Sequence, residues 1–335
     1  MKEKKKHWKD YVKVVLTKLP IFIFCVVFIS GYSHFYGTEN SIVGVILLMG
    51  LLMLMKADFG YGAKASAILI PVTFVGIGFL ALLADRGLWW GLLCHVAALV
   101  WVLALVRYDS GHTLYLPFVM GYVMFVGYPV VGSAAESRIL SLVVVGSAIG
   151  LIHFLLNRKV PRRHRLREMW KPFSLKESWA RWAITLGCTL TATLFFGVAI
   201  GFPKTMWMGL SVLSLLTPLE DEVRKRQWLR IPATILGCLV FFALFGILIP
   251  PNYQSMVVLM AGFMSMFINS YFIKTIYNSF SALVTATLFM PTEDAIGLRI
   301  IGNVAGAIIA VAATYLFAWI WRHTVSEEES MEAEA

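Results

Sequence analysis

The sequence predicts an all-α fold: a polytopic membrane protein of about twelve transmembrane helices, arranged as two parallel six-helix repeats. Three observations support this prediction: an apolar composition, a succession of apolar runs separated by polar breaks, and an internal match between the two halves. Of the 335 residues, 59% are hydrophobic and 14% are charged, and the mean hydropathy is +0.76. A soluble domain has roughly 45–50% apolar and about 25% charged residues, so the composition excludes an ordinary soluble domain.

The apolar runs define the expected crossings. A helix needs about 20 mostly apolar residues to cross the hydrocarbon of a bilayer, and somewhat fewer where a tilt or a neighbour compensates. Polar and turn-forming segments such as GTEN, ADRG, PPNYQ and PTEDAIG separate the runs, and we expect the charged segment from Glu220 to Gln227 to be a cytoplasmic turn between two of them. The expected crossings are centred near Phe28, Leu48, Thr73, Ala97, Met120, Val145, Thr191, Val212, Val240, Leu259, Leu283 and Ala310.

The basic residues predict the orientation of these crossings. If the N-terminus is cytoplasmic, 25 of the 29 Lys and Arg residues fall on the cytoplasmic side, and only Arg86, Arg138, Lys204 and Arg299 fall outside. Cytoplasmic loops of membrane proteins carry such an excess of basic residues. We therefore expect a multi-pass protein of the plasma (cytoplasmic) membrane with both termini in the cytoplasm.

The two halves of the chain match at a shift of 161 residues. A duplicated unit of six spans predicts parallel repeats, related by an axis along the membrane normal, with a pathway at their interface. We expect a basic interfacial segment at 1–18, repeats at 19–157 and 179–322, a basic linker at 158–178 and a disordered acidic tail at 323–335. The matched pairs are Lys64 with Lys225, Pro71 with Pro232, Gly76 with Gly237, and Arg138 with Arg299.

The basic charge and the cysteines each allow a simple interpretation. The net charge of +10 is concentrated at the ends of apolar runs, so we expect contact with anionic lipids and no nucleic-acid partner. The linker also allows a regulatory or partner-binding role, although we favour a basic belt on the membrane surface. The four cysteines, Cys25, Cys94, Cys188 and Cys238, lie within apolar runs without CxxC spacing, which favours buried small hydrophobes over a metal site or disulfides.

A short pattern recurs in the second half, where Arg230 to Gly237 and Arg299 to Gly306 both read R-I-x-small-x-x-x-G. Small residues four apart allow two helices in lipid to approach closely. With Met206-Trp207, Thr217-Pro218 and the charged segment that follows, these residues resemble the fusaric-acid-resistance (FUSC) family, related to the aromatic acid exporters. The resemblance covers about 179–322, and it suggests a short form of the family without large cytoplasmic domains. It departs from the family pattern at Met206 and at Ala233.

The resemblance implies a secondary transporter or exporter of small organic anions, aromatic carboxylic acids among them, driven by the proton gradient. Two alternatives are an organic-anion channel and a non-transporting membrane scaffold or accessory subunit. The sequence contains no phosphate-binding loop, no H-E-x-x-H and no recognisable Ser, His and Asp set, so we expect no enzyme activity, cofactor or metal. The expected partners are a small organic anion, anionic lipids, and either further copies of the chain or a periplasmic or extracellular adaptor.

Polar and aromatic residues within the second half, with one arginine of the first, are the candidates for a substrate pathway. Each has an alternative role. Lys274 also fits a cytoplasmic edge in a short break, Trp207 an aromatic belt, and the outer arginines a pairing with Glu136, Glu293 or lipid phosphate. The candidates are Trp207, Asn269, Tyr271, Lys274, Tyr277, Asn278, Arg230, Arg299 and Arg138.

Four ionisable residues are candidates for proton coupling: His95, His153, Glu220 and Asp221. Histidine changes its charge near physiological pH, as coupling to a proton gradient requires. For each histidine the alternative that we favour is a neutral ring hydrogen-bonded between helices. For the two acids we favour local pairing with the basic residues at 224–226.

Overall fold

The computed structural model of the chain describes residues 8–334 except 110, 112, 219, 288 and 289, and it leaves the side chains of 8–13, 220–224, 251 and 325–334 undescribed. The described residues form helices and connections and no strand, as expected for an all-α fold. The helices of the first half are α1 (Trp8–Tyr36), α2 (Ser41–Leu54), α3 (Ala63–Ala84), α4 (Leu88–Leu105), α5 (Tyr115–Gly127) and α6 (Ser133–Asn157), with a short turn η1 (Thr38–Asn40) before α2.

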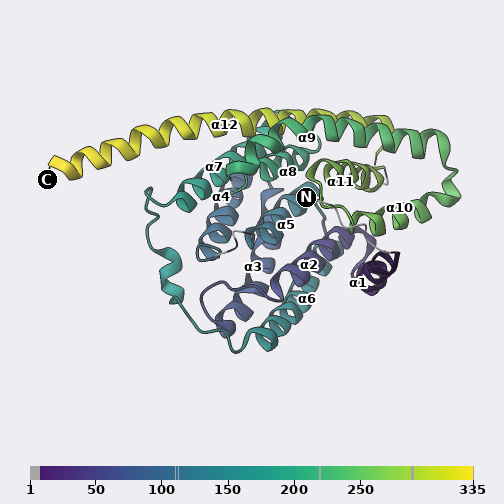
Figure 1. The fold of residues 1–335 in the computed structure, drawn as a ribbon, viewed down its shortest axis with the longest axis horizontal. Helices are drawn as coiled ribbons and strands as arrows, with labels where there is room; N and C mark the ends of the chain where they lie inside the picture. Colours follow the sequence, from purple (N-terminus) through teal and green to yellow (C-terminus); the bar gives the residue numbers. More distant parts are fainter. Residues whose placement is uncertain (1–7, 110, 112, 219, 288–289, 335) are drawn as a thin grey trace.

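The second half contains α7 (Ser178–Ala199), α8 (Thr205–Leu215), α9 (Glu220–Phe241), α10 (Pro251–Ser265), α11 (Tyr271–Ala286) and α12 (Thr292–Glu334). A short turn η2 (Leu166–Trp170) lies in the linker between the halves, and a π-helical segment η3 (Phe242–Leu248) extends α9. Figure 1 shows α12 running along the top of the molecule beside α9, while α1 and α10 lie at its right side.

Seven of the described helices are long and apolar enough to cross a membrane: α1, α3, α4, α6, α7, α9 with η3, and α12. The chain is therefore a multi-pass membrane protein by length and composition. Three shorter apolar helices are α2 with η1, α5 and α8, and the last has 11 residues. At 1.5 Å per residue, α8 is about 16 Å long, roughly half of the 30 Å hydrocarbon layer. Twelve full crossings and the two-repeat arrangement remain predictions.

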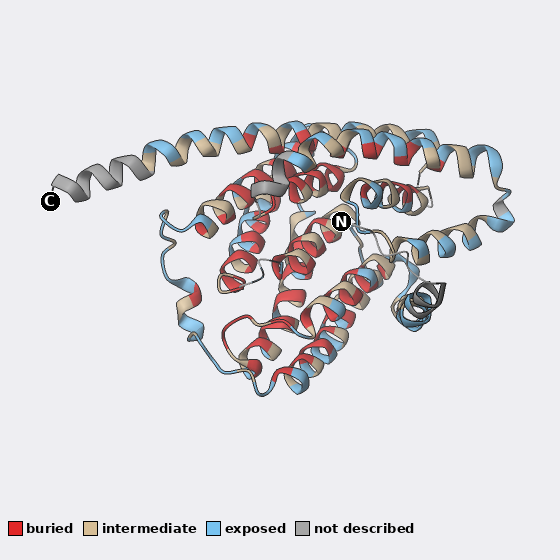
Figure 2. Cartoon of the chain, viewed as in Figure 1, coloured by how far each residue is buried: buried red, intermediate tan, exposed pale blue. Residues whose placement is uncertain are grey.

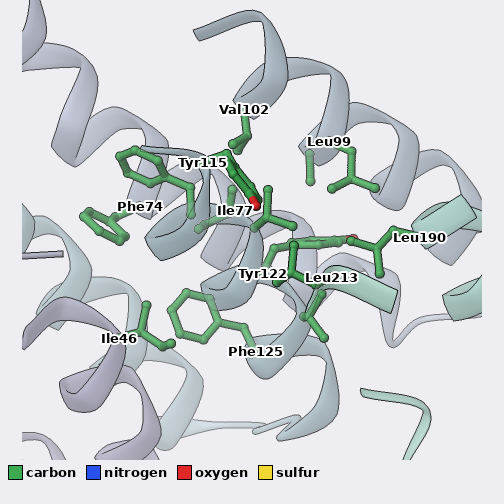
Figure 3. Packing of buried hydrophobic residues seen from close by; sticks show 14 of the residues in the cluster. Ile46, Phe74, Ile77, Leu99, Val102, Tyr115, Tyr122, Phe125, Leu190 and Leu213 are labelled. Carbon is green, nitrogen blue, oxygen red and sulfur yellow. The ribbon is translucent and has the colours of Figure 1, made fainter. Parts of the chain in front are cut away.

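One hydrophobic core joins the two halves of the chain (Figure 3). Ile46 of α2, Phe74 of α3 and Tyr122 of α5 lie in it with Leu190 of α7 and Leu213 of α8. Burial is deepest around these helices, whereas α1, α10 and much of α12 are exposed or half-buried (Figure 2). Since exposed apolar side chains are stable in lipid, this distribution agrees with a helix bundle surrounded by a bilayer.

Polar connections that are far apart in the sequence contact one another at two places in the bundle. At one place, the backbone N–H groups of Arg163 and His164 donate to the Gly60 carbonyl at 3.0 and 2.9 Å, and the His164 ring stacks on Tyr108 at 3.7 Å between centroids. At the other place, the Lys204 ammonium lies 4.9 Å from the Tyr128 ring. The connections predicted to be cytoplasmic thus contact one another, and the basic-residue bias still predicts which end faces the cytoplasm.

Several expectations need correction. The charged segment from Glu220 to Gln227 begins α9 and is not a turn, because Glu, Arg, Lys and Gln are good helix formers. Lys274 lies in the first turn of α11, and the break precedes it at 266–270. The acidic tail, expected to be disordered, continues α12 to Glu334, where Glu, Ala and Met favour helix. Among the cysteines, Cys188 is exposed and Cys25 is half-buried, since apolar runs that face lipid leave one side of each helix open.

The linker at 158–178 packs against the helix ends, as well as carrying basic charge. Arg163 forms an ion pair with Asp58 at 2.7 Å, and Arg107 donates to the Lys171 carbonyl at 2.6 Å. The Arg107 guanidinium also lies 4.9 Å from the Phe173 ring. These contacts attach the linker to the connections that precede α3 and follow α4.

Candidate anion-binding site

Four helices of the second half bring polar side chains together, and glycines determine how closely they approach. A Cβ at Gly237 of α9 would lie 2.7 Å from the Ile276 carbonyl of α11, and one at Gly306 of α12 would overlap the Met208 carbonyl of α8. Only glycine permits backbones this close, so the small-residue prediction is confirmed at both positions. The side chains around these contacts are therefore held in narrow spaces between α8, α9, α11 and α12.

Arg230 of α9 points into this region and is 5% exposed. Its Nη2 donates to Asn303 Oδ1 on α12 at 2.9 Å, and its guanidinium interacts with the Tyr271 hydroxyl on α11. That hydroxyl lies 3.0 Å from Ser214 Oγ on α8. Arg230 thus connects four helices through neutral partners.

Arg299 enters the same region from α12 and is 4% exposed. Its guanidinium lies 5.4 Å from the centre of the Trp207 ring, and Trp207 is 1% exposed. Asn303, one turn further along α12, donates from Nδ2 to the Arg299 carbonyl at 2.8 Å, which leaves its Oδ1 for Arg230. The two cations are close enough to repel each other electrostatically. We call Arg230 and Arg299 the arginine pair.

The arginine pair has donors without acceptors. Arg230 Nε, Arg299 Nε and Arg299 Nη1 are buried and have no hydrogen-bond acceptor among the described residues. Thr234 Oγ1 and Ser279 Oγ are also buried and have no hydrogen-bond partner among the described residues. A buried unpaired donor costs about 1–3 kcal/mol, and more when it is charged. A bound anion would satisfy these donors and relieve the repulsion between the two guanidinium groups.

No carboxylate of the described part of the chain supplies that negative charge. The ion pairs among described residues involve Arg107, Arg163, His164 and Lys171, all at the linker end of the bundle. The alternative pairing of the outer arginines with Glu136 or Glu293 is therefore absent from these ion pairs. Burial also keeps the guanidinium groups of the outer arginines, Arg138 and Arg299, away from lipid headgroups. It likewise excludes Trp207 from an aromatic belt at the membrane surface.

Arg138, which matches Arg299 in the sequence, has a different environment. It is 0% exposed, and it donates to Asn40 Oδ1 at 3.0 Å, to the Tyr128 carbonyl at 2.8 Å and to the Phe125 carbonyl at 3.4 Å. These acceptors belong to η1, α5 and the connection after α5. Arg138 is thus a satisfied structural cation, and the described residues of the first half include no buried donor without a partner of the kind found at the arginine pair.

The histidine candidates lie elsewhere and have partners. His95 Nδ1 lies 2.7 Å from the Tyr122 hydroxyl, and both residues are buried in the core. His153 Nδ1 lies 2.8 Å from the Leu54 carbonyl, so that nitrogen carries the proton. Both environments match the hydrogen-bonded alternative, and proton coupling through them remains a prediction. The side chains of Glu220 and Asp221 lie outside the described residues.

The remaining candidates lie on α11 and in the connection before it. Asn269 is exposed in that connection, Lys274 and Asn278 are exposed on α11, and Tyr277 is half-buried. Together with Ser281, also exposed, Lys274 and Asn278 follow one face of α11 at spacings of four and three residues. Of the α11 candidates, Tyr271 is the one that contacts the arginine pair.

Asn303 binds Arg230, and Ser214 binds Tyr271, yet neither residue was a candidate from the sequence. Asn303 follows Arg299 by four residues, so both lie on one face of a helix, and an asparagine within a predicted span is itself unusual. Ser214 lies on α8 seven residues after Trp207, again on one face. Among the described residues, no group of three or more His, Cys, Asp or Glu has a geometry that could hold a metal ion.

The part of the chain that contains the arginine pair is similar to a known protein family. Residues 190–317 match the family described as fusaric acid resistance protein-like. The matched range begins in α7, ends in α12 and contains Trp207, Tyr271, Asn303 and the arginine pair. The match confirms the resemblance for this range, which is less than half of the chain. No curated protein and no solved structure matches the chain.

Proposed function

We propose that this chain, similar in its second half to fusaric acid resistance protein-like proteins, is a secondary transporter of small organic anions that holds the anionic group at the arginine pair. The observation that carries the proposal is the set of three buried guanidinium nitrogens without an acceptor among the described residues. A guanidinium group presents its donors in a planar fork that matches a carboxylate. The family similarity supports membrane transport of small acids, and the arginine pair supplies the recognition chemistry.

Aromatic rings beside the arginine pair support a substrate with a flat apolar body. Trp207 lies against Arg299, and the Tyr271 ring lies 5.1 Å from the Arg226 guanidinium as well as next to Arg230. Aromatic rings and guanidinium groups both stack on planar molecules. The proposed substrate is therefore an organic carboxylate, with aromatic carboxylates preferred.

The polar face of α11 is the proposed approach to the arginine pair. A lysine and an asparagine exposed to lipid are costly, so polar residues within membrane segments usually line water-filled pathways. Lys274 lies three residues after Tyr271 and is therefore on a neighbouring part of the same helix face. An anion attracted by Lys274 would pass Tyr271 and reach Arg230.

We also propose that transport is coupled to a proton gradient. His95 is the stronger candidate, because its Nδ1 shares a short hydrogen bond with the Tyr122 hydroxyl inside the core that joins the two halves. A change of its protonation would alter packing between α4 and α5. An exporter would use that change to alternate the access of the arginine pair.

The proposal is tested by flux of labelled benzoate into liposomes that contain the purified full chain, with and without a pH gradient. We expect saturable uptake that a gradient accelerates, and a loss of at least tenfold in Arg299→Gln and Arg230→Gln. Lys225→Gln is the matched control, because it removes an exposed charge from α9 outside the cluster and should leave flux unchanged.

The result also separates the alternative functions. Flux that is insensitive to the gradient and to His95→Gln and His153→Gln, yet lost in the arginine variants, would favour an anion channel. Absence of flux in correctly folded protein, for butyrate as well as benzoate, would contradict transport and favour a scaffold or accessory subunit.

A further inference from the structure

A cavity of about 410 Å³ lies between α7, α9, α12 and the segment that follows α8. The short length of α8 creates it, because the chain leaves that helix at Leu215 and continues through Leu216, Thr217 and Pro218, which line the cavity. This cavity lies at the linker end of the bundle, where the apolar stretches of α7 and α9 begin. The transport proposal uses none of its lining residues.

One end of the cavity is polar. Ser178 opens α7 there, and the first N–H groups of a helix attract anions. The N-cap residue Glu177 does not line the cavity, and its carboxylate pairs with Arg107 at 3.5 Å. Arg181, one turn further, is half-buried and donates from Nη1 to the carbonyls of Leu175 and Lys176. Gln227 Nε2 is buried and has no acceptor among the described residues. The cavity is lined by no Asp or Glu among those residues.

The other end of the cavity is walled by indole rings in fixed positions. Trp182 Nε1 donates to the Leu216 carbonyl at 3.2 Å, and Trp321 Nε1 donates to Thr185 Oγ1 at 3.3 Å. Trp179 lies 6.2 Å from Trp182 between ring centroids. With the N–H groups of Trp182 and Trp321 satisfied, these two rings present apolar surface to the cavity.

The cavity borders the lipid-facing side of α12. Tyr315, which is 70% exposed, forms part of its wall, and Trp319 on the same helix is 61% exposed outside it. Tryptophan and tyrosine are enriched at the level of lipid headgroups. The exposed rings of Tyr315 and Trp319 therefore agree with a cavity at headgroup depth.

We propose that this cavity binds an anionic phospholipid of the adjoining leaflet. The phosphate group lies at Arg181, Gln227 and the N-terminus of α7, and the upper part of an acyl chain lies between Trp182 and Trp321. An amphiphile with a negative head and an apolar body matches both ends of the cavity, and the leaflet on the basic side of a membrane protein supplies such lipids. This inference is independent of the proposed transport function.

The test is quenching of tryptophan fluorescence by brominated lipid. The purified full chain is placed in phosphatidylcholine nanodiscs that contain a small fraction of brominated phosphatidylglycerol or brominated phosphatidylcholine. Three of the 11 tryptophans line the cavity, so we expect brominated phosphatidylglycerol to quench up to about a quarter of the emission at low mole fraction. Brominated phosphatidylcholine should give only the weaker quenching that rises in proportion to its amount.

Matched variants assign the effect to the cavity. Arg181→Gln with Gln227→Leu should abolish the saturable quenching, and Trp321→Phe should reduce it. Trp319→Phe, which removes a lipid-facing ring of the same helix, should lower quenching by both lipids equally, and Lys225→Gln should change nothing.

Three results would overturn the inference. Equal quenching by the two lipids, or unchanged quenching in the Arg181 and Gln227 variant, would show that the cavity does not select an anionic lipid. Displacement of the brominated lipid by millimolar glycerol phosphate would show that the cavity takes a soluble phosphate. We expect no displacement, because glycerol phosphate lacks the acyl chain.

Discussion

Replacement of Arg299 by methionine should stabilise the unliganded protein, although it removes the proposed anion site. The substitution eliminates two buried donors without acceptors and the repulsion from Arg230. At about 1–3 kcal/mol for each donor, less about 1 kcal/mol for the lost contact with the Trp207 ring, the expected gain is about 1–5 kcal/mol. Functional sites commonly carry such a cost in stability.

The matching substitution in the first half should have the opposite sign. Arg138→Met would remove the donor to Asn40 Oδ1 and to the Phe125 carbonyl in a buried environment. A buried acceptor left without its donor costs about 1–3 kcal/mol. Two arginines that occupy equivalent positions under the shift of 161 residues are thus predicted to differ in the sign of their effect.

Thermal melting of the purified variants in one detergent measures both effects. We expect a higher melting temperature than wild type for Arg299→Met and a lower one for Arg138→Met. Addition of benzoate should raise the melting temperature of the wild type and leave Arg299→Met unchanged, since a ligand stabilises only the state that binds it. If Arg299→Met melts well below wild type, as Arg138→Met does, Arg299 is a structural residue and the anion-site argument fails.

Three further predictions concern packing, the linker and the core histidine. Gly306→Leu should separate α12 from α8 and destabilise the protein by several kcal/mol, because any Cβ there overlaps the Met208 carbonyl. We expect a much lower melting temperature than that of the wild type, and an unchanged melting temperature would contradict this prediction. The pKa of Glu168 is lowered, chiefly by its hydrogen bond from the backbone N–H of Arg165. The ionised Glu168 therefore stabilises the folded linker above the ordinary pKa of 4.5, and this stabilisation is lost as the pH falls through the lower pKa of the folded state. Hydrogen exchange at 165–171, corrected for intrinsic rates, should accelerate only at such low pH and in Glu168→Gln. His95→Gln should abolish acceleration of benzoate flux by a pH gradient while retaining basal flux; acceleration equal to wild type would exclude His95 from coupling.

Composition and charge patterning were sufficient to predict the fold class. Helix formation and membrane insertion depend on local apolar character, so the all-α structure and the presence of several membrane-spanning helices could be predicted along the chain. The starts of the helices near Glu220 and Lys274 were harder to predict from the sequence. Charged residues fit both a turn and the first turns of a helix, and packing decides between them.

The candidate site was only partly predictable for a different reason. Arg230, Arg299, Trp207 and Tyr271 were identifiable as polar or aromatic residues within apolar runs, and the structure brings them together. Arg138 has the same local sequence character as Arg299, yet the acceptors that neutralise its donors come from Asn40 and from the end of α5, far away in the sequence. Whether a buried arginine is satisfied depends on such distant partners, which no local pattern of one half reveals.

The most direct test of the central claim is equilibrium binding of labelled benzoate to the purified full chain. If the arginine pair holds the anion, wild type and Lys225→Gln should bind alike, and Arg230→Gln and Arg299→Gln should each weaken binding at least tenfold. Binding that is unchanged in both arginine variants would contradict the account, because the anion would then be held elsewhere.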